Sequence, residues 1–79
     1  MKLTYDPRYN IGYLRFQEPK GSVETIHISD QLNVDIAPDG TLYGIELLNA
    51  NAQLRGENGS KLLVVNEALD EQTELTLSL

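Results

Sequence analysis

The sequence predicts a small α+β protein that is mostly β, with an antiparallel meander of about five strands, one short helix and then a C-terminal strand pair. Three observations lead to this class. Apolar and polar residues alternate along most of the chain, which is the period of a strand that buries one face. Clusters of Pro and Gly interrupt the alternation at short intervals. The 79 residues, of which 41% are hydrophobic, suit a single small β-rich domain over residues 1–79.

Alternation predicts the first two strands, over residues 2–6 and 12–17. Pro7 ends the first strand because proline cannot donate a hydrogen bond to a sheet. In the second strand Leu14 and Phe16 share one face, and both are expected to be buried. β-branched residues predict a third strand over residues 23–29. A change of parity among its apolar residues favours a bulge or an early strand end near Glu24.

The clearest element is a hairpin formed by residues 32–36 and 43–47, in which apolar and polar residues alternate strictly. Residues 37–40, with the sequence Ala-Pro-Asp-Gly, join the two strands. Proline presets φ at the second position and Gly40 can adopt a positive φ, so we predict a type I turn with a glycine bulge. Gly44 in the second strand indicates a bulge or the close approach of another group.

A short helix is predicted over residues 50–55, before a polar loop at residues 57–60. Asn49 is its predicted N-cap, because an Asn side chain can accept a hydrogen bond from an unpaired N–H of the first turn. Gly56 is expected to follow the helix in a left-handed backbone conformation.

The last part of the chain leaves two alternatives, a helix over residues 60–71 or a second hairpin. Residues 62–65 are β-rich, and the leucines of residues 73–79 alternate onto one face. These two features favour a pair of strands joined around residues 69–71. The leucine-rich last strand would then be free to associate with another chain.

The acidic composition narrows the classes of partner. Twelve acidic and six basic residues give a formal charge of -6, which opposes binding to nucleic acid and favours encounter with a basic protein. The absence of cysteine excludes disulfides, thiolate metal sites and cysteine nucleophiles. No apolar run approaches the roughly 18 residues of a spanning helix, and the first residues lack an apolar signal region. We therefore expect no membrane association and a cytoplasmic location.

Candidate catalytic and metal-binding groups are few. His27 is the only histidine and could pair with Asp30, but a regular strand would place these two positions on opposite faces. Asp6, Asp35 and Asp39 are spread across turns and do not follow the pattern of a calcium loop. We expect no enzyme activity, no catalytic residue, no metal site and no cofactor. The alternative is a small-ligand or metal-binding accessory protein that uses His27 and nearby carboxylates.

Three residues are the candidates for contact with another protein. Tyr9 and Tyr13 lie off the expected buried face, and a tyrosine combines apolar area with a polar tip. Packing under a neighbouring loop or helix is the equal alternative for both. Glu46 lies within an apolar strand, where it must face water, pair with an arginine or line an interface.

The order and spacing of several short motifs resemble the domain-of-unknown-function 2283 family of small bacterial proteins. The resemblance covers residues 2–54, and it is carried by Tyr5-Asp6-Pro7, Tyr13-Leu14-Arg15-Phe16, Asn33-Val34-Asp35, Asp39-Gly40 and Gly44-Ile45-Glu46-Leu47-Leu48-Asn49-Ala50. It implies a β-rich fold and a prokaryotic origin, but no activity. Some relatives are encoded beside small toxin-like proteins, which implies a partner-binding or antitoxin role.

These observations lead to a non-enzymatic protein–protein interaction domain as the expected function. A chain of this length buries only a small core, which favours self-association into a dimer. Sheet edges and the leucine-rich last strand are the expected contact regions. A basic protein is the second expected partner.

Overall fold

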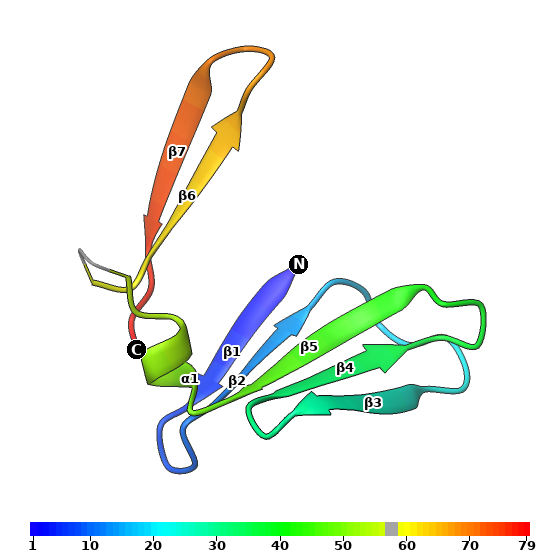
Figure 1. Cartoon of the computed structure of the whole chain (residues 1–79). Helices are drawn as coiled ribbons and strands as arrows, with labels where there is room; N and C mark the ends of the chain where they lie inside the picture. Colours follow the sequence, from blue (N-terminus) through cyan, green and yellow to red (C-terminus); the bar gives the residue numbers. More distant parts are fainter. Residues whose placement is uncertain (57–58) are drawn as a thin grey trace.

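The computed structural model describes residues 1–56 and 59–79, and within them it contains seven strands and one short helix (Figure 1). The strands are β1 (Lys2–Asp6), β2 (Ile11–Arg15), β3 (Glu24–Ser29), β4 (Leu32–Ile36), β5 (Leu42–Leu48), β6 (Lys61–Asn66) and β7 (Glu71–Thr76). Helix α1 (Ala50–Gln53) lies between β5 and β6. The predicted fold class, mostly β with one short helix and a C-terminal strand pair, is confirmed.

Five strands form one antiparallel sheet in the order β1-β2-β5-β4-β3, and β6 pairs with β7 in a separate sheet. The predicted meander is built from a β1–β2 hairpin and a β3–β4–β5 meander. These two parts meet where β2 pairs with β5. The connection after β2 therefore runs past the middle of the sheet to the far edge, where β3 lies (Figure 1).

The strand register places one row of apolar residues straight across the sheet. Its members pair directly from strand to strand and are Leu3, Leu14, Ile45, Val34 and Ile26. Because side chains alternate between the two sides of a strand, the adjacent row points to the opposite side. That row is polar apart from one aromatic ring, and it consists of Thr4, Tyr13, Glu46, Asn33 and His27. We call these two sides the apolar face and the polar face.

Two details of the predicted second strand are wrong. The strand ends at Arg15, and Phe16, which was expected to be buried, is 38% exposed. Phe16 follows the last residue of β2 that pairs with β1 and β5, and it lies outside the part of the sheet that borders α1 and the base of the arm. The third strand begins at Glu24, which confirms the early strand end predicted there as the alternative to a bulge, and its register shifts between His27 and Ser29, close to the turn into β4.

The turn between β4 and β5 has the predicted geometry. Gly40 has a φ of 89°, in the left-handed region that favours glycine, and its N–H donates to the Ala37 carbonyl oxygen at 2.9 Å. A further irregularity follows where the register shifts between Asp35 and Ile36. The extra residue on β5 at this point is Tyr43, which is buried.

Helix α1 is capped by a residue from a distant part of the chain. Asn49, the predicted N-cap, has a φ of 54° and makes no side-chain capping hydrogen bond. The Ala50 N–H donates to the Asn10 carbonyl oxygen at 2.9 Å, and the Asn51 N–H donates to Asn10 Oδ1 at 2.9 Å. The prediction of a left-handed Gly56 is also wrong, because the helix closes with a C-cap residue at a φ of -95°.

Strands β6 and β7 form a hairpin, which confirms the second of the two alternatives for residues 60–71. We call β6, β7 and the turn between them the arm. Asn66 Oδ1 accepts the N–H groups of Ala68 at 3.1 Å and Leu69 at 3.2 Å, and Asp70 closes the turn with a φ of 53°. In Figure 1 the arm stands away from the five-stranded sheet and comes near it only at its base, beside α1.

The described residues form only a very small buried core. Only three hydrophobic residues among them are buried, namely Ala37, Tyr43 and Ala50. A single sheet with one short helix is too thin to enclose a core, since stable domains need two packed layers. The radius of gyration, 14.2 Å, exceeds the value of about 12 Å for a compact domain of this length. No helix in the described part has the length and apolar character needed to cross a membrane.

Candidate interaction surfaces

Tyr13 lies on the polar face in a space that Gly44 leaves open. A Cβ at Gly44 would overlap the Tyr13 ring and its hydroxyl, which confirms the close approach predicted at this glycine. Tyr13 Oη donates to Asp35 Oδ2 at 2.6 Å. Partial burial, followed by this hydrogen bond, raises the pKa of Tyr13 to about 12, because both favour the neutral phenol.

Asp35 and Arg15 complete the surroundings of Tyr13. Asp35 Oδ1 accepts the hydroxyl of Thr25 at 2.6 Å, so both carboxylate oxygens are engaged. The Arg15 guanidinium carbon lies 4.9 Å from the centroid of the Tyr13 ring, within the range of a cation–π contact. Arg15 Nε is also 3.7 Å from a carboxylate oxygen of Glu18. These contacts connect β2, β3, β4 and β5 on the polar face.

Glu46 belongs to a second chain of hydrogen bonds on the polar face. Asn33 Nδ2 donates to Glu46 Oε1 at 3.0 Å, and Asn33 Oδ1 lies 2.9 Å from His27 Nδ1. Glu46 is also the register partner of Tyr13. The structure thus places two of the three candidate contact residues, Tyr13 and Glu46, side by side, and each is bonded to a neighbouring strand.

His27 lies exposed on the edge strand β3. The turn after β3 brings Asp30 back toward it, with Nε2 and Oδ1 3.9 Å apart, although a straight strand would separate them. Neither of the two clefts described below includes His27. In residues 1–56 and 59–79 no three His, Asp or Glu side chains come together as a metal site would require.

Tyr9, the third candidate contact residue, is separate from the other two. It lies in the turn between β1 and β2 and is 72% exposed. The Arg8 guanidinium carbon is 5.8 Å from its ring centroid. Asp6 accepts the Arg8 N–H at 2.9 Å, in the turn that follows β1. Hydrogen bonds from Arg8 lower the pKa of Asp6.

A cleft of about 500 Å³ opens between the apolar face and the base of the arm. The sheet and α1 contribute leucines to one side of this cleft, namely Leu3, Leu14, Leu47 and Leu54. The arm and the residue after it contribute the other side through Leu62, Leu75 and Leu77. The cleft is therefore lined mainly by leucine, and beyond it the arm and the sheet diverge (Figure 1).

The arm has two faces, which the strand register distinguishes. Leu62 pairs with Leu75, and alternation places Val64 on the same side. We call this side, which faces the cleft, the inner face. On the outer face Lys61 Nζ lies 3.1 Å from Glu74 Oε1. Val64 on the inner face is 51% exposed and Val65 on the outer face is 44% exposed, so neither face is covered.

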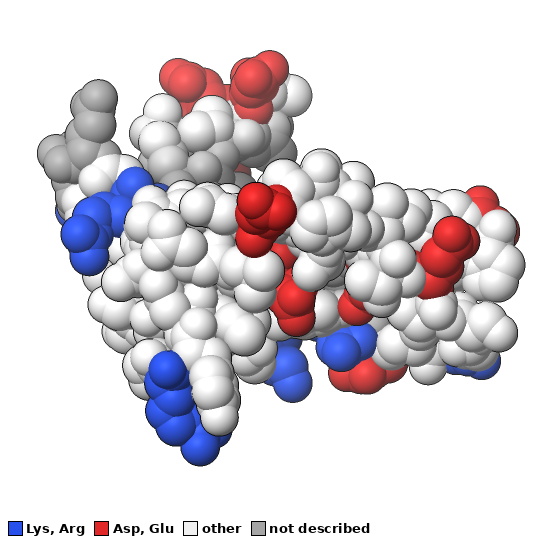
Figure 2. Space-filling view, turned by 60° about the horizontal axis from the view of Figure 1, so that its bottom comes forward, with Lys and Arg blue, Asp and Glu red and all other residues white. Residues whose placement is uncertain are grey.

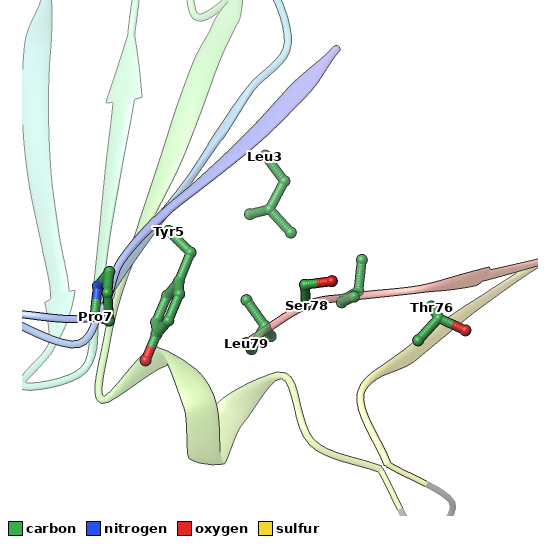
Figure 3. A pocket seen from close by; sticks show the side chains of 7 residues that line it. Leu3, Tyr5, Pro7, Thr76, Ser78 and Leu79 are labelled. Carbon is green, nitrogen blue, oxygen red and sulfur yellow. The ribbon is translucent and has the colours of Figure 1, made fainter.

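A second cleft lies between β1 and the residues that follow β7. It measures about 550 Å³. In Figure 3, Leu3 and Tyr5 of β1 point toward the side of the cleft on which Ser78 and Leu79 lie. This cleft continues the apolar surface around the edge strand β1, so the apolar surface is not confined to the middle of the sheet.

Charged side chains do not gather into a basic surface on the face shown in Figure 2. Acidic and basic groups are scattered there over largely uncharged surface, and the part of the arm visible at the top carries acidic groups. This distribution agrees with the excess of acidic residues in the composition.

The inner face of the arm is a candidate interaction surface that the sequence candidates for contact did not include. Its sequence signal is the run of β-branched and leucine residues at 62–65, followed by alternating leucines from residue 75. The alternation predicted two strands, but it did not show that the pair would lack a covering layer. Only the position of the arm relative to the sheet reveals this.

Comparison with known proteins gives one family. The family model described as "Protein of unknown function (DUF2283)" matches residues 2–51. This match runs from β1 into α1, so it covers the five-stranded sheet and stops before the arm. No curated protein and no solved structure matches the chain at a significant level.

Proposed function

Because this match spans more than half of its length, the chain belongs to the DUF2283 family of proteins of unknown function, and we propose that it is a non-enzymatic protein–protein interaction domain. In this role the protein binds another chain, which covers the apolar face of the sheet and the inner face of the arm. The observation that carries this proposal is that α1 and the base of the arm cover only part of the apolar face, while the inner face of the arm is exposed. The matched region would supply the sheet, and the arm would supply the second contact surface.

The accessible surface area supports the proposal. The chain exposes 5910 Å², whereas a compact monomer of 8.8 kDa exposes about 4,800 Å². Large hydrophobic residues make up much of the exposed surface of the arm, namely Leu62, Leu63, Val64, Val65, Leu69 and Leu75. Leu62, Val64 and Leu75 share the inner face, and exposed apolar side chains grouped in this way are typical of interaction sites. An isolated two-stranded hairpin is also only marginally stable in water, so the arm gains stability when it is covered.

The polar face supports a role that is not catalytic. Its carboxylates and its histidine are engaged with neighbouring strands through Asp35, Glu46 and His27. Groups arranged in this way tie strands together and leave no acid–base pair directed into a cleft. The excess of acidic residues adds a preference for basic protein surfaces over nucleic acid, as an antitoxin-like partner of a basic protein would have.

The test is the mass of the complex that the chain forms in its own cells. The tagged full-length chain is isolated from the source organism under native conditions and measured by native mass spectrometry. We expect a species heavier than one chain with the natural sequence and with Val65→Lys, and its loss with Val64→Lys. Val64 and Val65 are neighbours on opposite faces of β6, so the second variant controls for the added charge.

A single species with the mass of one chain, for the natural sequence in the cell extract and after purification, would contradict the proposed function. An enzymatic role would instead require turnover of a substrate that depends on His27 or Tyr13.

A further inference from the structure

We propose that the chain covering these surfaces is a second copy, and that each copy lays the inner face of its arm across the apolar face of the other. This inference rests on the proposed function and adds the identity of the partner and the geometry of the contact. The product is a symmetric dimer in which the arms are exchanged. Each sheet then gains the second layer that a single chain lacks.

The amount of surplus surface fits a dimer. The area of 5910 Å² exceeds that of a compact monomer by about 1,100 Å². A stable interface of standard size removes about 800 Å² from each partner. Burying the arm and the apolar face would therefore bring the exposed area of each chain down to the range of an ordinary folded protein.

The two surfaces match in size. The strands of the arm have six residues each, which gives the arm a length of about 20 Å. Five strands spaced about 4.8 Å apart place the outer strands of the sheet about 19 Å from each other. The arm is thus long enough to reach across the row formed by Leu3, Leu14, Ile45, Val34 and Ile26.

The two surfaces also match in chemistry. The row across the apolar face is entirely aliphatic, and the inner face presents Leu62, Val64 and Leu75. The Lys61–Glu74 pair lies on the outer face, with Lys61 also at the edge of the cleft, and Glu71 lies at the tip end of the inner face. Contact through Leu62, Val64 and Leu75 therefore leaves these charges at the margins of the interface, in water, which avoids the cost of burying them.

A second copy accounts for both surfaces at once. A foreign protein would have to present two separate apolar surfaces, one to the sheet and one to the arm. Two copies related by a twofold axis satisfy both surfaces twice, because each copy supplies one arm and one sheet. Strands β1 and β3 remain at the edges of the sheet in this arrangement.

The first experiment measures the mass of the purified full-length chain by size exclusion with light scattering at tens of micromolar. We expect twice the mass of the 8.8 kDa chain. Val64→Lys should weaken dimerisation by about 100-fold, since it removes a buried valine at two symmetric contacts. Val65→Lys, on the outer face, should leave the dissociation constant within about threefold of that of the natural sequence.

The second experiment locates the contact. The chain has no cysteine, so single cysteines can be introduced into separately tagged copies and joined with a short bismaleimide. We expect a product between Val64→Cys in one copy and Val34→Cys in the other. Val65→Cys with Val34→Cys should give at least about tenfold less product, because alternation directs residue 65 away from the inner face.

The dependence of the complex on salt concentration distinguishes a second copy from a basic partner. Each copy carries a formal charge of -6, so raising the salt concentration screens the repulsion between copies and should strengthen the dimer. A complex with a basic protein would weaken under the same change. A dimer that weakens with added salt would contradict an apolar contact between like-charged chains.

Three results would overturn the proposed dimer. A monomer in light scattering would remove it. Predominant cross-linking within one chain carrying both Val64→Cys and Val34→Cys would show that the arm closes on its own sheet. A complex with a different protein in the cell, together with a purified monomer, would leave the proposed interaction function standing and reject the second copy as the partner.

Discussion

Gly44 makes room for Tyr13 on the polar face of the sheet. The phenol lies over this glycine, and its hydroxyl reaches Asp35 at 2.6 Å. Asp35 in turn accepts the hydroxyl of Thr25. One ring and one carboxylate therefore join four strands at a place where the molecule has almost no core. Small changes at these residues should affect the whole fold.

Replacing Gly44 with Ala should destabilise the protein by about 1–3 kcal/mol, because the added methyl group forces the Tyr13 ring to move. Urea unfolding followed by circular dichroism measures the change. Gly21→Ala is the control, since a Cβ at Gly21 would meet no atom within 4 Å. Equal effects of the two substitutions would show that Tyr13 does not depend on the space at Gly44.

Tyr13 should also make the free energy of unfolding depend on pH between 10.0 and about 12. Its pKa is raised from 10.0 to about 12, so between these values the folded state keeps a proton that the unfolded state loses. The free energy of unfolding is therefore complete below pH 10.0 and decreases as the pH rises toward 12. Urea unfolding at stepped pH should show this decrease for the natural sequence.

Tyr13→Phe provides the comparison for the pH dependence. It should lower the stability at neutral pH by about 1–3 kcal/mol, because the carboxylate of Asp35 loses a donor. It should also flatten the decrease at high pH. Tyr9→Phe, in an exposed turn, should change neither quantity. An unchanged alkaline profile in Tyr13→Phe would assign the decrease to other groups.

At the scale of the elements, α1 is held in place by Asn10 from the turn between β1 and β2. Asn10 has a φ of 55°, and its side chain donates to Asn51 Oδ1 at 2.8 Å and accepts the Asn51 N–H at 2.9 Å. The phenol of Tyr5 donates to the same Asn10 oxygen at 3.1 Å. A Cβ at Gly12 would lie 3.2 Å from Ala50 Cβ, so the helix packs closely over this glycine.

Asn10→Gly should cost about 2 kcal/mol of unfolding free energy, because the helix loses its side-chain cap while the positive φ is still accommodated. Asn10→Ala should cost roughly 1 kcal/mol more, since alanine is strained in the left-handed region. Urea unfolding measures both. If the two variants were equally stable, the backbone conformation at residue 10 would contribute nothing.

At the scale of the molecule, neither the five-stranded sheet nor the arm is fully covered by a second layer. On the polar face of the sheet, side chains of neighbouring strands hydrogen-bond to one another. The apolar face is partly covered by α1 and the base of the arm. The arm extends beyond the sheet (Figure 1). Such a chain has a small margin of stability when it is alone, and association is the direct way to increase that margin.

The exchanged dimer should make thermal stability depend on protein concentration. A tenfold rise in concentration adds about 1.4 kcal/mol to the stability of a dimer relative to two unfolded chains. For two chains of 79 residues, this corresponds to an increase of about 4 °C in the unfolding midpoint. Differential scanning calorimetry over a hundredfold range of concentration measures it. A constant midpoint would contradict a dimer that unfolds and dissociates together.

The sequence by itself determined most of the elements of this protein. Alternation, together with Pro and Gly at the turns, located β1, the β4–β5 hairpin and the arm, because these signals act between residues close along the chain. Tyr9, Tyr13 and Glu46 were named separately as candidate contact residues, from their places in the local pattern, and only the strand register brought Tyr13 and Glu46 together. Local patterns do not, however, identify the neighbours of a strand.

Tertiary structure alone decided which strands became neighbours and which surfaces remained open. The pairing of β2 with β5, and the capping of α1 by Asn10, join residues that are 29 to 41 positions apart. Neither can be read from a local period, because such contacts depend on how the whole chain closes. The exposure of Phe16 and of the inner face has the same origin. An apolar residue is buried only where another layer covers it, and no property of the residue alone supplies that layer.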